Sequence, residues 1–287
     1  MPPGEYPWSS NLDSLSLYFF SNPPYSPRCK EYVAAGAVFA KWRSPLVIDV
    51  SKGCPTDIAI RANMHDLARY ALICQDEGLV PIVEPDISLS GSHTLEQAIQ
   101  INIKVQAELY KAMIDHGVYM EGSTLKPNIV NPGRDCTESY TVEEIGAANI
   151  RVLRDVFPVA MPGANFLSGG QSLQDAAARL SAMNKVEGNS PWNLSFSWSQ
   201  ALQLPLLDLC KAKGEVRRRA RVLDVSGVHF TNTQLLPPQL CLDEMGKLYV
   251  EELKIASAAA KGEWSWDGEE GSHGKKGKKR ELSAMLG

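Results

Sequence analysis

The chain has few of the sequence features that would indicate a stapled, metal-bound or nucleic-acid-binding protein. Its six cysteines in 287 residues are scattered, with no C-x-x-C pair and no adjacent histidine pattern. A zinc site or a disulfide framework is therefore not expected, and a reducing compartment, the cytoplasm, fits best. The net charge of -4 gives no electrostatic reason to expect nucleic-acid or membrane-surface binding.

Long apolar runs and nucleotide-binding glycine motifs are also missing. The apolar run Leu15–Phe20 is interrupted by serine and soon meets Pro23-Pro24. It is too short to span a membrane and has no basic segment typical of a signal peptide. No strand pattern leads into G-x-G-x-x-G or G-x-x-x-x-G-K, so a nucleotide-binding fold has no support.

What is present is an alternation of short apolar segments with amphipathic ones. Hydrophobic residues make up 44% of the chain, enough for a substantial core. The pattern predicts strands at 37–42, 79–84, 164–168 and 193–197, and a strand carrying Lys126 within 118–130. Thr56, Thr94, Thr141 and Ser172 are predicted to start helices, with capping boxes completed by Gln97 and Glu144, and a last helix is expected over Gln200–Lys213.

Strands that alternate with helices predict an α/β protein with a parallel sheet. Polar residues gather at the carboxyl ends of the expected strands, which is typical of a (β/α)₈ TIM barrel. Only about five βα units are visible, however, so the sequence predicts an incomplete barrel.

Lys126, immediately before Pro127, is the candidate nucleophile. A lysine attacks a carbonyl as the neutral amine, which burial and a second cation such as Lys41 favour. Glu84 could carry protons during dehydration of a carbinolamine, and Asp86 points the same way along the strand. The simpler alternatives are a lysine at an edge reaching water and a Glu84–Lys41 ion pair, and the second is compatible with catalysis.

Two further features suit an anionic substrate. The guanidinium of Arg43 can bind phosphate through paired hydrogen bonds, although it could also be a surface ion-pair partner. The Ser168-Gly169-Gly170 turn lies between an expected strand and helix, where backbone amides can approach an anion. A Ser-Gly-Gly sequence is otherwise often a simple tight turn.

Several long motifs occur in an order that carries a family resemblance. They are Phe39–Arg43, Gly78–Asp86, Tyr119–Asn128, Phe166–Ser172 and Leu194–Ser197. On these motifs the chain resembles the class I, Schiff-base-forming fructose-bisphosphate aldolases, from about Arg28 to Glu215 and again from about Leu240 to Gly262. The resemblance implies a TIM barrel, a glycolytic lyase, a homotetramer, and chemistry without a metal or organic cofactor.

The resemblance also implies roles for individual residues. Lys126 would form the Schiff base with the ketone of fructose 1,6-bisphosphate, and Glu84 would be the acid and base. Lys41 would assist positioning and proton transfer, with Asp86 and Trp42 in support. Residues implied to bind the sugar phosphate are Arg43 at the aldehyde end, Ser168, Gly169 and Gly170 at the other phosphate, and Ser199. The motifs are compatible with either fructose 1,6-bisphosphate or fructose 1-phosphate as the preferred substrate.

The chain departs from the family pattern in four places. Three N-terminal βα units are missing, and with them an aspartate and a lysine of the family's site. Ser199-Gln200 stands where many members have Gly-Arg, a cationic phosphate ligand. The chain ends in Leu286-Gly287 rather than in tyrosine, and an insertion occupies residues 216–239. Because valine and glutamine codons can supply intron borders, we hypothesise that this insertion is a translated, unspliced intron, and that the leader is a second gene-model error.

The expected organisation is an irregular leader (1–27), a partial barrel (28–262) and a flexible basic tail (263–287). Two alternatives to an aldolase remain. One is a catalytically impaired barrel fragment with a binding or assembly role. The other is nucleic-acid binding by Arg217–Arg221 and Lys275–Arg280, which are better interpreted as solvated segments because no aromatic residues are interleaved.

Overall fold

The computed structural model describes residues 25–186, 191–209 and 238–265. The strands are β1 (Phe39–Leu46), β2 (Val80–Ile87), β3 (Thr124–Leu125), β4 (Gly163–Phe166) and β5 (Asn193–Phe196). The α-helices with full bounds are α2 (Tyr25–Ala34), α3 (Asp57–Asp76), α4 (Leu95–Asp115), α5 (Val142–Val156), α6 (Leu173–Lys185) and α8 (Pro238–Ala260). Two short 3₁₀ helices are η2 (Val50–Lys52) and η3 (Met120–Gly122), and residues 200–209 are also helical.

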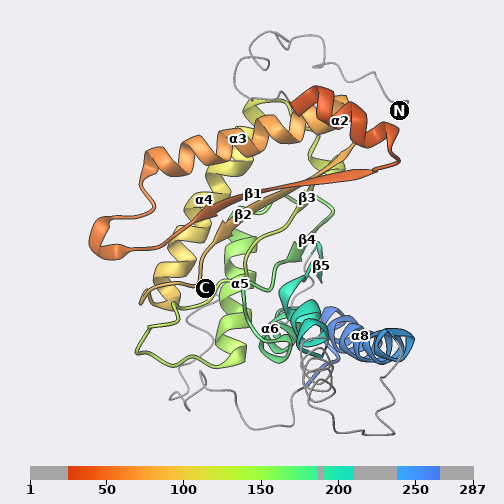
Figure 1. The fold of residues 1–287 in the computed structure, drawn as a ribbon. Helices are drawn as coiled ribbons and strands as arrows, with labels where there is room; N and C mark the ends of the chain where they lie inside the picture. The colour runs from red at the N-terminus through yellow and green to blue at the C-terminus, as the bar shows by residue number, and fades with distance from the viewer. Residues whose placement is uncertain (1–24, 187–190, 210–237, 266–287) are drawn as a thin grey trace, which may run out of the picture.

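The five strands form one parallel sheet in the order β1-β2-β3-β4-β5. Figure 1 shows this sequential order, with α3 near β1 and α8 near β5. Neighbouring helices contact each other from α3 through α4, α5 and α6 to α8. Strand order equal to chain order is the barrel arrangement. The sheet does not close on itself within the described residues, which confirms the expected incomplete barrel.

Side-chain caps begin the helices where the sequence predicts. Thr56 and Ser172 accept backbone hydrogen bonds at the starts of α3 and α6. Thr94 and Thr141 form complete capping boxes at the starts of α4 and α5. Each cap satisfies helix N–H groups that would otherwise have no acceptor.

The strand predicted through Lys126 is wrong in its extent. The 3₁₀ helix η3 precedes β3, and β3 ends one residue before Lys126. Prolines in β2 explain this short pairing. The Val83 carbonyl accepts a hydrogen bond from the Lys126 N–H. The backbone polar groups of Val83, and those of the alternate residues Pro81 and Pro85, therefore point toward β3. Since proline has no N–H, regular pairing with β3 is confined to Ile82–Val83. The other strands differ from their predicted bounds by a few residues at most.

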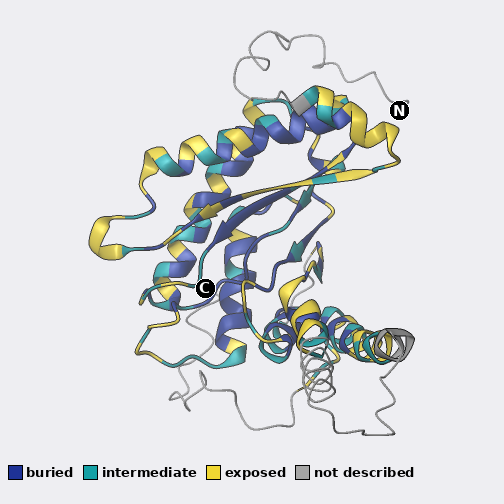
Figure 2. Cartoon of the chain, in the orientation of Figure 1, coloured by how far each residue is buried: buried dark blue, intermediate teal, exposed yellow. Residues whose placement is uncertain are grey.

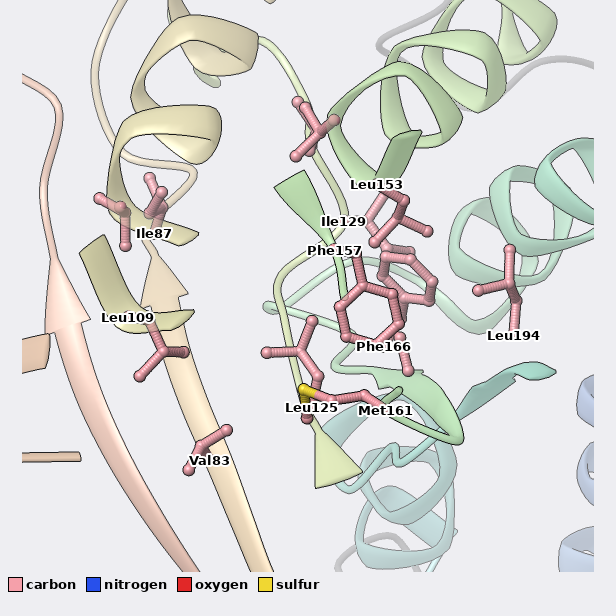
Figure 3. Packing of buried hydrophobic residues seen from close by; sticks show 14 of the residues in the cluster. Val83, Ile87, Leu109, Leu125, Ile129, Leu153, Phe157, Met161, Phe166 and Leu194 are labelled. Atoms are coloured by element: carbon pink, nitrogen blue, oxygen red, sulfur yellow. The ribbon is translucent and has the colours of Figure 1, made fainter. Parts of the chain in front are cut away.

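The hydrophobic core lies between the sheet and its helices. Val83, Leu125 and Ala164 occupy the same sheet face through their register, and all three are fully buried. Figure 3 shows Phe166 of β4 close to Phe157 and Leu153 from the α5 region, with Leu125 and Val83 on the neighbouring strands. Because successive side chains of a strand point to opposite faces, the residues between these apolar ones lie on the other face of the sheet.

Burial differs strongly between the first two strands. β2 is almost entirely buried, whereas most residues of the edge strand β1 are exposed, as Figure 2 shows. Val38 and Phe39, at the start of this edge, are 68% and 59% exposed. No helix among the described residues is long and apolar enough to cross a bilayer.

Some predicted segments fall outside the described residues. They are residues 1–24 of the leader, 210–213 of the helix expected after β5, 216–237 of the insertion, 266–287 of the tail, and both basic runs. The segment Met245–Lys254, which the sequence assigns to the last helical region, lies within α8.

Candidate functional site

A cavity of about 370 Å³ lies at the carboxyl ends of the strands. Its walls include Lys41 and Arg43 of β1, Glu84 and Asp86 of β2, and Lys126 after β3. Residues that follow β4 and β5 complete it: Ser168, Gly169, Gly170, Ser197 and Ser199. Every strand of the sheet therefore contributes to one polar cavity, as expected for the catalytic end of a barrel.

The register of β1 and β2 brings their charged side chains to the same face. Arg43 is paired with Glu84, two residues before the Pro45–Asp86 pair. Because side chains alternate across a strand, Lys41 and Arg43 share their face with Glu84 and Asp86. Trp42 points the other way, and its ring lies 6.1 Å from that of Tyr70 on α3. Trp42 does not line the cavity, so any supporting role is through packing beneath β1.

The backbone holds Lys126 between two strands. Its N–H donates to the Val83 carbonyl at 2.8 Å, and the next carbonyl, that of Pro127, accepts from the Leu167 N–H at 2.9 Å. The Lys126 side chain is only 14% exposed. The Lys126 side chain is thus largely shielded from water, although it still lines the cavity.

Glu84 lies within ion-pair distance of two lysines. Its Oε2 atom is 2.9 Å from Lys41 Nζ and 3.5 Å from Lys126 Nζ, and its side chain is 5% exposed. Neither contact has the angular geometry of a hydrogen bond, and within the described residues this buried oxygen accepts none. A buried carboxylate so placed can take a proton from one group and return it to another.

Arg43, which also lines the cavity, is held by Asp86. Its Nε donates to Asp86 Oδ2 at 2.7 Å, and its Nη2 is 2.5 Å from the same oxygen. The Arg43 side chain is half exposed while that of Asp86 is buried. Asp86 therefore orients a half-exposed guanidinium that lines the cavity and keeps further N–H groups for other acceptors.

The Ser168–Gly170 turn has the backbone shape of an anion cradle. Gly169 and Gly170 both adopt left-handed conformations, with φ of +59° and +77°, which glycine accepts without strain. Ser168 is buried, and Ser172 caps α6 immediately afterwards. Successive amides in such a turn, next to a helix N-terminus, favour a bound anion.

Side-chain hydrogen bonds from Gln171 and Arg179 also support this turn. Gln171 donates from its side chain to the Ser168 carbonyl at 2.8 Å, and Arg179 of α6 donates to the Gln171 side chain. Burial lowers the pKa of Arg179, and the Asp175 carboxylate opposes that shift. The turn is therefore tied to α6 by side chains as well as by the chain itself.

Sequence reasoning did not predict several residues of the cavity wall, and Asn128 and Arg134 are two polar examples. Asn128 lines the cavity, and its Oδ1 accepts from the Ile87 N–H at 3.1 Å, tying the segment after Lys126 to the end of β2. Its position inside the Tyr119–Asn128 motif was a signal for this. Arg134 also lines the cavity, beside Gly170. No local pattern marks Arg134, because a pairing of two distant loops places it there.

The arrangement suits covalent carbonyl chemistry on an anionic substrate. A shielded amine, a buried carboxylate and a second amine meet within one cavity, with an arginine at one side and a glycine turn at the other. Among the described residues, no three His, Cys, Asp or Glu side chains are grouped so as to hold a metal ion.

Comparison with known proteins gives a consistent result. The family model for class-I fructose-bisphosphate aldolase matches residues 24–225. The chain is 50% identical over 196 residues to fructose-bisphosphate aldolase 2 of Plasmodium berghei, a match that covers 68% of this chain and 53% of the relative. It is 49% identical over 194 residues to fructose-bisphosphate aldolase of Dictyostelium discoideum, covering 68% of this chain and 54% of the relative.

Among solved structures, the chain resembles a fructose-bisphosphate aldolase from Plasmodium falciparum determined in complex with TRAP and a small-molecule inhibitor. The TM-score is 0.72 at 38% sequence identity, and the match covers 84% of this chain and 62% of that one. This chain spans about half the length of the curated relatives it matches.

Proposed function

Because the chain belongs to the class-I fructose-bisphosphate aldolase family, we propose that it acts as a Schiff-base aldolase. The proposed reaction is the reversible cleavage of fructose 1,6-bisphosphate to dihydroxyacetone phosphate and glyceraldehyde 3-phosphate, as in glycolysis. The observation that carries the proposal is the position of Glu84 Oε2, 2.9 Å from Lys41 Nζ and 3.5 Å from Lys126 Nζ.

The first half of the proposed reaction forms an iminium ion. The free amine of Lys126 attacks C2 of the open-chain ketose and gives a carbinolamine. Glu84 in its acid form donates a proton to the C2 hydroxyl, which leaves as water, while the nitrogen lone pair forms the C=N bond. Lys41 helps to hold the oxygen and to keep Glu84 supplied with protons.

The second half breaks the C3–C4 bond. Glu84, now ionised, takes the proton of the C4 hydroxyl, the C4 oxygen becomes a carbonyl, and the bond electrons flow to the iminium nitrogen. Glyceraldehyde 3-phosphate leaves. The enamine is protonated at C3, and water then hydrolyses the imine to release dihydroxyacetone phosphate and regenerate Lys126.

Substrate binding is assigned to the two sides of the cavity. Arg43, oriented by Asp86, receives the phosphate at the aldehyde end. Ser168, Gly169 and Gly170 hold the phosphate at the ketone end, with Ser199 beside them. Trp42 supports β1 from its packed face.

The proposal extends to assembly and compartment. We propose a homo-oligomer, a tetramer by family resemblance, that works in the cytoplasm. The described cysteines Cys29, Cys54, Cys74 and Cys136 are all free thiols, which agrees with a reducing compartment.

Borohydride trapping tests the central step. The chain is incubated with dihydroxyacetone phosphate, reduced with borohydride and digested, and the modified peptide is identified by mass spectrometry. The adduct is expected on Lys126 and absent from the Lys126→Met variant. Lys185→Met, which changes an exposed lysine of α6, is the matched control and should retain the adduct.

A coupled assay with fructose 1,6-bisphosphate and fructose 1-phosphate accompanies the trapping. Trapping with turnover supports the aldolase, and trapping without turnover indicates an impaired enzyme. If neither occurs, the proposal is wrong and the binding or assembly role is favoured. Cleavage that survives Lys126→Met would exclude this Schiff base.

A further inference from the structure

Arg134 lies in the cavity wall next to the glycine turn that follows β4, whereas Arg43 belongs to β1. Its Nη2 donates to the Gly170 carbonyl at 3.3 Å, across 36 residues of sequence. The side chain is exposed and lines the cavity. Its guanidinium therefore contacts the edge of the turn proposed to hold a phosphate, while four of its five N–H groups remain for other acceptors.

Two paired loops fix this position. The loop after β2 and the loop after Lys126 exchange backbone bonds: Arg134 N–H to Leu89 O at 2.9 Å, Gly133 N–H to His93 O at 2.8 Å and Asp135 N–H to Gly91 O at 2.9 Å. A Cβ at Gly133 would lie 2.1 Å from Gly91 O, so only glycine permits this approach. The Arg134 backbone is thus anchored on both sides.

The glycine turn also lies close to the Arg134 guanidinium. A Cβ at Gly170 would lie 2.8 Å from Arg134 Nη2. This distance shows how closely the guanidinium lies against the turn, while the left-handed backbone, with φ of +77°, is what favours glycine at this position.

Charge pairing separates Arg134 from the other cations of the cavity. Lys41 and Lys126 both face Glu84, and Arg43 is paired with Asp86. Within the described part of the chain, Arg134 forms no ion pair, and its hydrogen bond is to a backbone carbonyl. Its positive charge is therefore not offset by a carboxylate and is available to an incoming anion.

We infer that Arg134 is a substrate-binding residue that completes the Ser168–Gly170 cradle and holds the phosphate at the ketone end of the sugar. The inference rests on the proposed function for the identity of the substrate. The backbone amides of the turn contact one side of the phosphate, and the planar guanidinium of Arg134 contacts another. Together with Arg43, it gives the cavity a cationic group at each end for a bisphosphate.

Phosphate binding measured without catalysis tests the inference. In the Lys126→Met background, which cannot form the imine, inorganic phosphate and dihydroxyacetone phosphate are titrated by calorimetry. Arg134→Gln should raise both Kd values roughly ten- to hundredfold, the effect of losing a charge-assisted hydrogen bond. Arg134→Lys should lose less affinity than Arg134→Gln because lysine keeps the positive charge, although it lacks the planar guanidinium that can form paired hydrogen bonds.

Two controls make the result specific. Lys261→Gln removes an exposed positive charge outside the cavity lining and should leave both Kd values unchanged. With Lys126 intact, trapping of unphosphorylated dihydroxyacetone on that lysine should be the same in the wild type and in Arg134→Gln. Circular dichroism verifies that each variant is folded.

The outcomes separate this inference from the proposed function. Unchanged phosphate affinity in Arg134→Gln, or an equal loss in Lys261→Gln, would overturn the inference. If the chain shows neither trapping nor turnover but its phosphate affinity still depends on Arg134, the aldolase proposal fails while the phosphate site stands.

Discussion

Glu84 is a single residue whose neighbours define the chemistry proposed for the cavity. It lies almost fully buried between the amines of Lys41 and Lys126. A carboxylate that lies near two amines and lines the same cavity is placed to pass protons to and from a bound substrate.

Glu84→Gln removes the proton carrier while preserving size and shape. We expect kcat/KM for fructose 1,6-bisphosphate to fall roughly 10²- to 10⁴-fold, the usual contribution of general acid–base catalysis. Formation of the borohydride-reducible adduct should also be slower, because loss of water from the carbinolamine needs an acid. Quenching with borohydride at a series of short times measures this rate.

Asp86→Asn is the matched control for this prediction. Asp86 contacts Arg43 rather than either lysine. Its loss should mainly raise KM through a poorly oriented guanidinium, with adduct formation from dihydroxyacetone phosphate nearly unchanged. A Glu84→Gln protein that forms the adduct at the normal rate would contradict the proposed role of Glu84.

At the scale of elements, α5 and α6 approach each other closely at Gly146. A Cβ on Gly146 would lie 2.8 Å from Ala182 Cβ and 3.1 Å from the Ala182 carbonyl carbon. Helix propensity alone favours alanine over glycine by about 0.5–1 kcal/mol. Overpacking of a tight interface costs about 1–3 kcal/mol, so the contact should outweigh the propensity.

Gly146→Ala is therefore expected to lower the free energy of unfolding by about 1 kcal/mol. Gly246→Ala in α8 is the paired control, since nothing lies within 4 Å of a Cβ there, and it should be neutral or stabilising. Urea denaturation of both variants measures the two effects. Equal effects of the same sign would show that helix propensity, rather than packing, dominates at Gly146.

The elements also show how far sequence reasoning extends. Helix starts at Thr56, Thr94, Thr141 and Ser172 follow from side chains within three residues of the cap, so local sequence predicts them. The facing of Lys41, Glu84 and Asp86 follows from the two-residue period of a strand. Strand ends were less predictable, because the extent of β3 depends on Pro81 and Pro85 in its neighbour.

Arg134 illustrates what local patterns cannot supply. Its contact with Gly170 requires that loops about 40 residues apart exchange backbone bonds through Gly91 and Gly133. Neither loop has a periodic pattern. Trp42, predicted only to support the site, faces away from Lys41 and Arg43, as the alternation of side chains along a strand requires.

On the scale of the whole molecule, buried histidine makes folding sensitive to acid. His93 is 3% exposed and lies in the loop that pairs with Gly133. Burial lowers its pKa below the ordinary 6.5, and a backbone contact at Asn131 partly opposes this. The unfolded chain therefore binds a proton at a higher pH than the folded protein does, so stability falls as pH drops below about 6.5.

His93→Gln should reduce this loss of stability between about pH 7 and pH 5. Urea unfolding at a series of pH values measures the slope. Burial, with smaller effects of His65 and Arg69, also lowers the pKa of His116, so the His93→Gln/His116→Gln double variant should flatten the slope further. The same slope in the wild type and in His93→Gln would contradict the prediction.

The whole sheet is open at both ends of its strand order within the described residues. β1 pairs with β2 alone in the described part of the chain, and Val38 and Phe39 at its start are exposed. Polar residues at the strand ends nevertheless converge on one cavity, because the parallel register among the five strands places them at the same edge. The cavity proposed as the catalytic site is thus formed without closure of the sheet within the described residues.

The hydrogen bond from the Lys126 N–H to the Val83 carbonyl has a practical consequence. It uses only main-chain atoms, which every residue except proline could provide at this position. The backbone arrangement at Lys126 is therefore independent of its side chain, so Lys126→Met should remove the proposed covalent step and leave the cavity assembled. The Lys126→Met protein should bind the proposed sugar-phosphate substrate without cleaving it and could be used to isolate the natural ligand from cell extract.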